Sequence, residues 1–359
     1  MDFSNRFNKA NVKNYSLEEG MKDRTDNSIT ENKHKEIVKR ISKMYKKFFN
    51  EKKSISVPYK TSGEWEDYIS ERKGLYNHLL NENIDEATEI LKNFWRNELG
   101  TIVKEYAKYD QIKNNETDYI ERFKNSVLRN FLIYKEVFKK DSNFLKIPNC
   151  GNPWGIVIES DLIAPKSTRF AAHSIQIQNL TKDISCPIIA EIGGGYGGLA
   201  YYLLRDNKDL TYIDFDLPET LVLISYYLLY IFPEKKIFLY GEGNIPDKNE
   251  LNKYSAILLP NYCLPVISND TADVFYNSFS LSEIHKDSLD EYFKQISRIT
   301  KKYFFHNNMD RKGVVNRGYE RMPCSEYPID EKIFTNIYTQ FDLFHSHKGD
   351  YKECLYIKS

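Results

Sequence analysis

The feature that most constrains this chain is a glycine cluster directly after an apolar stretch. Residues 187–200 read PIIAEIGGGYGGLA. The apolar run predicts a buried strand and the residues after the glycines predict a helix, because glycine allows a tight turn between the two. A helix that begins at such a turn presents unpaired N–H groups. The segment therefore favours a strand–turn–helix unit that binds a nucleotide-bearing ligand.

Two kinds of ligand fit this turn. Gly193, Gly195 and Gly198 satisfy the spacing of dinucleotide-binding loops. Gly193, Gly195 and Gly197, with Glu191 two residues ahead, fit the loop that binds S-adenosylmethionine. A carboxylate at Glu191 suits a ligand with an ammonium group and opposes a pyrophosphate. The residues favour S-adenosylmethionine and leave the dinucleotide as the alternative.

A second apolar stretch ends in two acids. Asp214 and Asp216 share one face of the expected strand, since side chains alternate along a strand. A carboxylate at the strand tip, about 20 residues beyond the glycines, is placed to bind the two ribose hydroxyls. Asp216 lies nearer the tip, so it is the expected ribose ligand, and Asp214 is an equally ordinary structural acid.

Strands and helices alternate through the second half of the chain. Apolar strands are expected at 188–191, 210–216, 236–240, 256–259, 273–277 and 303–306, and helices at 167–180, from 196, 220–232 and 286–300. The end differs, because 341–345 and 353–357 read as an antiparallel hairpin. This pattern predicts an α/β fold with a mostly parallel sheet and a C-terminal antiparallel hairpin.

The domain organisation follows from the change of pattern near Asn149. We expect a mobile tail over 1–27 and a helical N-terminal domain of about four helices over 28–148. A hairpin and a helix over 149–183 are expected to connect the helical domain to the ligand-binding domain or to cap the latter. Residues 184–359 form the ligand-binding domain.

Composition excludes several classes of protein. The 359 residues carry 51 basic and 51 acidic side chains, so we expect no nucleic-acid partner held by bulk charge. No apolar run reaches the length of a membrane span, and the N-terminus has no apolar signal core, which favours a cytoplasmic protein. The five cysteines are widely spaced, which supports neither a zinc site nor a disulfide framework.

Taken together, three motifs resemble a known family. Glu191-IGGGYGGLA, Asp216-Leu-Pro-Glu-Thr and Asn277-Ser-Phe-Ser-Leu-Ser-Glu283 are similar to the bacterial sugar O-methyltransferases of the class I S-adenosylmethionine-dependent superfamily. The resemblance covers about residues 150–358. It implies a Rossmann-like methyltransferase domain with a C-terminal antiparallel hairpin, S-adenosylmethionine as cofactor, and a sugar or nucleotide-sugar of a surface glycan as substrate.

The resemblance also implies an adenine contact after the third strand. The superfamily often has Gly-Asp where this chain has Pro260-Asn261. Asn261 can still bond the adenine amino group and Tyr262 can cover the ring. Glu242 is the rival candidate.

The acceptor is expected beyond the fourth and fifth strands, where ligands lie in such sheets. Methyl transfer to a hydroxyl needs alignment and a proton acceptor. Glu283 is the first candidate base, with a helix cap as its alternative role, and His306 and His285 are the other catalytic candidates. The expected substrate contacts are Trp154, Arg169, His173, Asn277, Ser280 and Asn308.

Other interpretations stay open. The acceptor can be a phenolic or other small metabolite, or the chain can be a non-catalytic module that binds a nucleotide. His345 and His347 lack a third metal ligand, and no metal is expected, although carboxylate-bound magnesium remains compatible with the family. The basic segment 301–321 is either a solvated loop or a contact for an anionic sugar. A homodimer is also compatible with the sequence.

Overall fold

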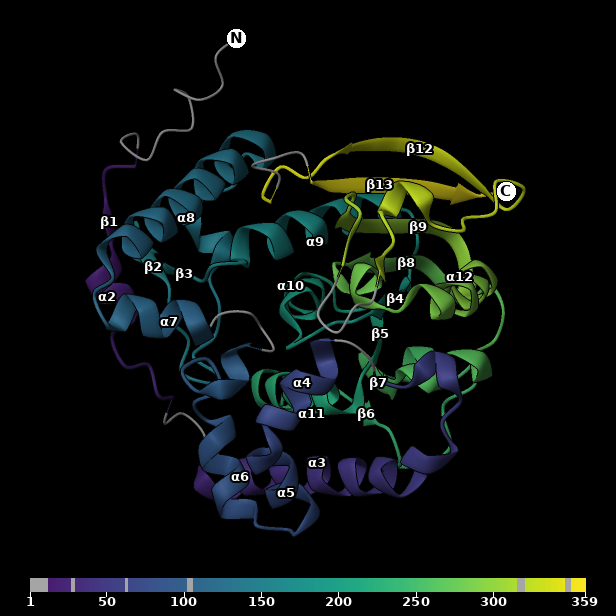
Figure 1. Cartoon of the computed structure of the whole chain (residues 1–359), viewed down its shortest axis with the longest axis horizontal. Coiled ribbons are helices and arrows are strands. Elements are labelled where there is room, and N and C mark those ends of the chain that lie inside the picture. Colours follow the sequence, from purple (N-terminus) through teal and green to yellow (C-terminus); the bar gives the residue numbers. More distant parts are fainter. Residues whose placement is uncertain (1–11, 27–29, 62–63, 102–105, 315–319, 346–349) are drawn as a thin grey trace.

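An eight-stranded sheet organises the part of the chain that the computed structural model describes, which is residues 12–26, 30–61, 64–101, 106–314, 320–345 and 350–359. Its strands, in spatial order, are β12 (Phe334–Phe341), β13 (Tyr351–Lys358), β9 (Thr300–Met309), β8 (Ala272–Ser278), β4 (Ile188–Ile192), β5 (Thr211–Asp216), β7 (Ala256–Pro260) and β6 (Ile237–Leu239) (Figure 1). All strands from β9 to β6 are parallel to one another. β13 is antiparallel to both β9 and β12.

This topology confirms the predicted fold class. The sheet is mostly parallel and ends in an antiparallel hairpin, as predicted, with β6 as an additional strand at one edge. The predicted hairpin bounds are wrong in one respect: β12 ends at Phe341, where we expected it to begin. The strand Phe334–Phe341 has one buried residue and mostly exposed ones, so it lacks the apolar run by which a strand is found in sequence.

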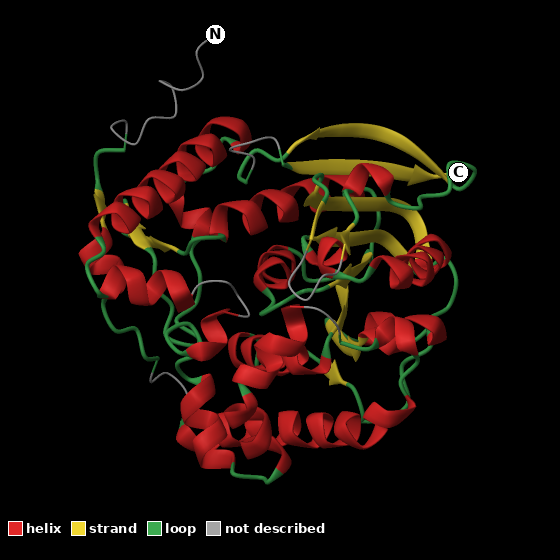
Figure 2. Ribbon diagram, in the orientation of Figure 1, coloured by secondary structure: helices red, strands yellow, loops and turns green. Residues whose placement is uncertain are grey.

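The two faces of the sheet carry separate hydrophobic clusters, because side chains alternate along each strand. Ile189, Tyr212, Leu258 and Tyr276 pack on one face, and Ala190, Ile213, Ile257 and Phe275 pack on the other. The first face is covered by α9 (Ser167–Thr181), α10 (Gly198–Asp206) and α11 (Pro218–Ile231), and the second by α12 (Lys286–Ile299) (Figure 2). Because β9, β8, β4, β5, β7 and β6 are parallel, their carboxyl ends lie together at one end of the sheet.

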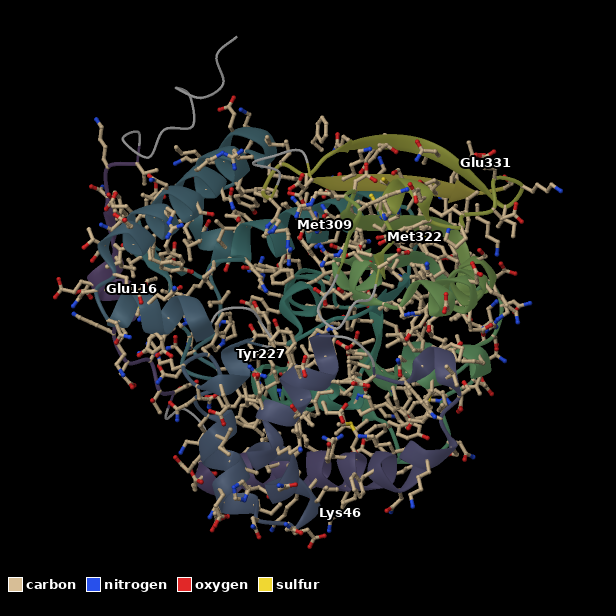
Figure 3. The ribbon with its side chains drawn as sticks, viewed as in Figure 1. Lys46, Glu116, Tyr227, Met309, Met322 and Glu331 are labelled. Atoms are coloured by element: carbon tan, nitrogen blue, oxygen red, sulfur yellow. The ribbon has the colours of Figure 1, made fainter. Side chains whose placement is uncertain are left out.

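The helical region before the sheet is more segmented than the four expected helices. Its helices are α3 (Glu31–Glu51), α4 (Glu64–Glu71), α5 (Lys73–Leu80), α6 (Ile84–Leu91), α7 (Tyr106–Lys113) and α8 (Thr117–Phe138). α4 and α5 are separated at Arg72, so a stretch with helical periodicity over 65–80 forms two helices. α3 packs on α11 and joins the same hydrophobic cluster. In Figure 3, Tyr227 of α11 lies in the interior, whereas Lys46 of α3 lies at the outer margin.

Residues 12–26 correct the prediction of a mobile tail through residue 27. β1 (Tyr15–Ser16) pairs with β2 (Ile156–Ile158), which pairs with β3 (Asp161–Ile163), and α2 (Leu17–Met21) follows β1. The Gly155 amide also donates to the Gly20 carbonyl at 3.2 Å. These bonds involve the backbone, so a polar segment without hydrophobic periodicity can make them. A further short pair, β10 (Gly313–Val314) with β11 (Glu320–Arg321), lies beyond β9.

Candidate active site

The glycine turn connects β4 to α10 as the sequence predicts. Gly193, Gly195 and Gly197 have φ values of 79°, 64° and 92°, a region that other residues enter at a cost. A Cβ at Gly193 would collide with Ser280 Oγ, whereas the space beside Gly195 is open. The turn therefore brings the backbone close to one neighbour and leaves room for a ligand at the other.

Beside this turn the structure has a cavity of about 260 Å³. It lies at the carboxyl ends of β4, β5, β7 and β8, and four residues of the helical region, Pro58, Lys60, Thr61 and Trp65, also line it. Its lining comprises Pro58, Lys60, Thr61, Trp65, Lys166, Arg169, Phe170, Glu191, Ile192, Gly193, Gly194, Gly195, Tyr196, Phe215, Asp216, Leu217, Thr220, Asn261, Ser278, Phe279, Ser280, Glu283, Ile284, Tyr292, His345 and Tyr351.

Five of the seven predicted cofactor residues line this cavity: Glu191, Gly193, Gly195, Asp216 and Asn261. Gly197 is the residue from which α10 begins and is outside the lining. The prediction for Tyr262 is wrong in position. Residues 261–266 form a 3-10 helix that turns Tyr262 away from Asn261. Its hydroxyl donates to Glu51 at 3.2 Å and its ring stacks on Phe48.

Buried carboxyl groups form one wall. Burial raises the pKa of Glu191 to about 8, although a hydrogen bond from Tyr212 (2.6 Å) and the charge of Arg169 act in the opposite direction. Burial raises the pKa of Asp216 to about 7, and the negative charge of Glu283 adds to the rise. Both groups are therefore costly to ionise in the protein alone and favour a cationic ligand.

The two acids of β5 have different positions. Asp214 is fully buried outside the cavity lining and accepts a bond from the Gly194 amide at 3.0 Å. Asp216 lies in the lining and accepts bonds from the amides of Gly195 at 3.0 Å and Leu217 at 2.6 Å. Asp214 thus holds the turn, and Asp216 faces the cavity.

Asn261 has an oxygen that needs a partner. Its Nδ2 donates to the Tyr59 carbonyl at 3.1 Å and to the Tyr292 hydroxyl at 2.8 Å. Its Oδ1 is buried and has no hydrogen-bond partner among the described residues. Such an atom costs free energy unless a ligand supplies a donor. The rival Glu242 lies outside the lining, bound to Arg40 at 2.7 Å.

Glu283 lines the cavity and belongs to the 3-10 helix Ser280–Glu283 that follows β8. Its Oε2 accepts a hydrogen bond from Trp65 Nε1 at 2.9 Å. Ser280 also lines the cavity, and its hydroxyl donates to the Ile192 carbonyl at 2.9 Å. Of the three predicted catalytic residues, Glu283 reaches the cavity.

The two predicted catalytic histidines lie elsewhere. His306 is fully buried in the middle of β9, where its ring stacks on Tyr356 with centroids 5.8 Å apart. We expected the strand to end at His306, but it continues to Met309. The His306 side chain therefore lies within the sheet and not at the carboxyl end of the strand. His285 precedes α12 as its N-cap and accepts from the Asp287 amide at 3.2 Å.

Four of the predicted substrate residues support the structure instead. Trp154 is completely buried and donates to the Trp95 carbonyl. His173 lies between the Tyr276 hydroxyl and the Glu353 carboxylate, 3.4 Å away. Asn277 donates to the Ile192 carbonyl at 2.8 Å, and Asn308 donates to Asn277 at 2.8 Å. Each position forms part of a buried hydrogen-bond set outside the lining.

Arg169 does line the cavity, near Glu191. Its guanidinium lies 4.0 Å from the centre of the Phe279 ring and 4.9 Å from that of Phe170. Guanidinium groups stack well on aromatic faces, which orients this side chain. A positive group next to Glu191 makes this part of the wall complementary to a ligand with both charges.

Sequence reasoning did not place three ring-bearing side chains in the cavity lining. Phe279, His345 and Tyr351 contact one another, with centroids 4.5–5.0 Å apart. Phe279 has φ 69° and ψ −34°, a strained conformation for a residue other than glycine. Trp65 and Lys60 come from the helical region, more than 100 residues from the motifs. The spacing of these residues along the chain does not indicate that they share a site.

The basic segment 301–321 is largely neutralised. Lys301 pairs with Asp273 at 2.8 Å, Arg311 with Asp350 at 3.4 Å and Lys312 with Glu326 at 2.8 Å. Lys302 lies over Tyr303, Arg321 bonds the Ser282 carbonyl, and Arg317 lies outside the described residues. These contacts weaken the interpretation of the segment as an anion site.

Within the described ranges, no group of three or more His, Cys, Asp or Glu side chains is arranged to hold a metal ion; His347 falls outside them. None of the described helices has the length and apolarity to cross a membrane.

Comparison with known proteins gives matches among solved structures. Neither a protein-family model nor a curated protein matches the chain. A protein of Pyrococcus horikoshii aligns with a TM-score of 0.38 and 11% identity, over 54% of this chain and 92% of its own. The mitomycin 7-O-methyltransferase aligns with a TM-score of 0.33 and 13% identity, over 54% and 57%. For the Burkholderia thailandensis 1,6-didemethyltoxoflavin-N1-methyltransferase the TM-score is 0.36 and the identity 15%, over 53% and 78%.

Proposed function

We propose that this chain transfers the methyl group of S-adenosylmethionine to a hydroxyl of a sugar. The observation that carries the proposal is the acidic wall beside the glycine turn, where Glu191 and Asp216 have raised pKa values of about 8 and about 7. A ligand with ammonium and sulfonium charges lowers the cost of ionising such groups, whereas a pyrophosphate raises it. The wall therefore favours S-adenosylmethionine over a dinucleotide.

The lining offers one partner for each polar part of that cofactor. Asn261 Oδ1, which lacks a donor among the described residues, suits the adenine amino group, and Asp216 suits the ribose hydroxyls. Glu191 suits the ammonium group of the methionine part, and Arg169 suits its carboxylate. The site thus has complementary charge along the whole cofactor.

The bound cofactor supplies a sulfonium methyl group that is open to displacement by an oxygen nucleophile. The protein must then place the acceptor hydroxyl in line, exclude water and take up its proton. Glu283 lies in the cavity as a carboxylate that can accept this proton, and Trp65 holds one of its oxygens. Ser280 fixes the turn from which Glu283 projects.

The acceptor class rests on two different supports. The motif resemblance favours a sugar, as part of a surface glycan or its nucleotide-sugar precursor. The cluster of Phe279, His345 and Tyr351 offers a flat apolar surface that can stack on a sugar face, and it equally favours a phenolic metabolite as the second candidate.

The testing experiment measures transfer of a radiolabelled methyl group from S-adenosylmethionine to a panel of nucleotide-sugars, glycan oligosaccharides and catechols. We expect product with a sugar acceptor and a loss of about 100-fold or more in kcat for Glu283→Gln. Transfer to catechols but not to sugars would select the second candidate. An unchanged kcat in Glu283→Gln would remove Glu283 from the chemistry.

A further inference from the structure

The cavity wall opposite the sheet comes from the N-terminal helical region. Pro58, Lys60, Thr61 and Trp65 line it, and Trp65 lies near the start of α4. Trp65 is the member of this group that hydrogen-bonds a predicted catalytic residue: its indole N–H donates to Glu283 Oε2 at 2.9 Å, across 218 residues of sequence. Two segments far apart in the chain thus meet at one carboxylate.

Trp65 differs from the other tryptophans of the chain. Trp95 and Trp154 are 1% and 0% exposed and belong to the hydrophobic core, as a large aromatic residue usually does. Trp65 is partly buried and faces the cavity, next to Tyr68 with ring centroids 5.7 Å apart. Its N–H donates to a carboxylate rather than to a backbone carbonyl, so its polar atom is directed at the candidate base.

The segment that carries Trp65 is tied to the rest of the protein at both ends. Before it, the Tyr59 carbonyl accepts a bond from Asn261 at 3.1 Å, and the Tyr59 hydroxyl donates to Glu291 at 3.0 Å. After it, Arg72 donates to the Glu98 carbonyl at 2.7 Å and lies over the Tyr68 ring. These contacts fix where α4 lies, and α4 in turn fixes the indole.

A hydrogen bond from the indole has two effects on a carboxylate base. It restricts the side chain to one orientation, and it stabilises the ionised form, because a donor to a carboxylate favours the charged state. A carboxylate has lone pairs for several bonds, so Oε2 can be held while the group still accepts a proton from a substrate hydroxyl.

We propose that Trp65 is a positioning residue for Glu283, so that the N-terminal helical region supplies a working part of the catalytic site. This inference rests on the proposed function, in which Glu283 is the base. Trp65 orients the Glu283 carboxylate toward the acceptor hydroxyl. It takes no part in the bond changes of methyl transfer.

The test compares Trp65→Phe with Tyr68→Phe, a matched control that removes a hydroxyl from the same helix outside the cavity lining. For Trp65→Phe we expect kcat to fall by about 10- to 100-fold while the Kd of S-adenosylhomocysteine, measured by calorimetry, changes by less than about threefold. The split between a lowered kcat and an unchanged Kd distinguishes a lost orientation of Glu283 from a damaged cofactor site. Tyr68→Phe retains the wild-type kcat and Kd.

A second measurement compares the tryptophan fluorescence of the wild-type protein with that of Glu283→Ala without any acceptor. Loss of the carboxylate that accepts from the Trp65 indole should change the emission, and the same replacement in the Trp65→Phe background should not. A wild-type kcat in Trp65→Phe would overturn the inference and leave the proposed function standing. Absence of methyl transfer in the wild-type protein would instead overturn the proposed function itself.

Discussion

At the scale of single residues, the buried carboxyl groups make the clearest predictions. Glu191 and Asp216 have pKa values raised to about 8 and about 7, chiefly by burial. A cationic ligand binds best when both are ionised, so its binding must release protons at neutral pH. The affinity for S-adenosylmethionine should therefore rise between pH 6 and 8 and level off above pH 8.

Calorimetric titration at pH 7 in two buffers with different ionisation enthalpies checks this expectation. The apparent binding enthalpies should differ in the sense of proton release. Equal enthalpies in the two buffers, or an affinity that falls as the pH rises, would contradict the role of the acidic wall.

Replacing Glu191 separates binding from stability. The folded protein keeps a proton on this group at pH values where the unfolded chain has released it, so a rise in pH from 5 to 8 favours unfolding. Glu191→Gln removes this contribution to the pH dependence of the free energy of unfolding. We expect it to stabilise the protein more at pH 8 than at pH 5 in urea unfolding, while S-adenosylmethionine binds at least about 10-fold more weakly. A variant that binds the cofactor normally would exclude Glu191 from the site.

At the scale of elements, the turn after β8 shows how the fold holds a strained residue. Phe279 has φ 69° and its amide donates to the Asn307 carbonyl at 2.8 Å. Asn277, which is fully buried, donates to the Ile192 carbonyl and contacts Ser280. These hydrogen bonds hold the turn in its conformation and offset the backbone strain at Phe279.

Asn277→Ala should therefore lower the free energy of unfolding by about 1–3 kcal/mol, because it leaves buried polar partners unsatisfied. Urea unfolding gives the value, and Asn249→Ala, at an exposed loop position, is the control. The same variant should also reduce kcat, since Ser280 and Glu283 project from this turn. A stability equal to that of the control would show that the turn does not depend on Asn277.

The elements also show what the sequence could reveal. Apolar runs located the parallel strands, and the glycine turn predicted the first ligand contacts, because strand alternation and glycine conformation are local properties. The ends of the strands were harder to predict from the sequence. β9 extends three residues beyond the expected end at His306, through Asn307, Asn308 and Met309. Asn307 and Asn308 are polar, and the fold buries both side chains by hydrogen bonding them. Because β9 is longer than expected, the predicted base His306 lies within the sheet and not at the carboxyl end of the strand.

Contacts between distant segments could not be predicted at all. Trp65 reaches Glu283 because α3 packs on α11 and brings the next helix over the cavity. No local pattern records that packing. Trp154 shows the converse: it stands beside a predicted hairpin, yet aromatic neighbours bury it in the core.

At the scale of the whole molecule, the helical region and the sheet share one hydrophobic cluster. Ile37 and Leu79 of the helical region belong to the same cluster as Tyr226 of α11 and Leu355 of β13. Removal of residues 1–148 would expose the apolar face of α11 to water. We expect the fragment 149–359 to be insoluble or to lack cooperative unfolding, and the full chain to unfold in one calorimetric transition. Two separate transitions, or a folded fragment that binds S-adenosylhomocysteine, would contradict a shared core.

The cavity beside the glycine turn should bind S-adenosylmethionine. Calorimetric titration of the full chain with S-adenosylhomocysteine and, separately, with NADH at pH 7.5 tests this directly. We expect saturable one-site binding of S-adenosylhomocysteine that Asp216→Ala abolishes, and no heat of binding for NADH. Saturable binding of NADH without binding of S-adenosylhomocysteine would contradict it.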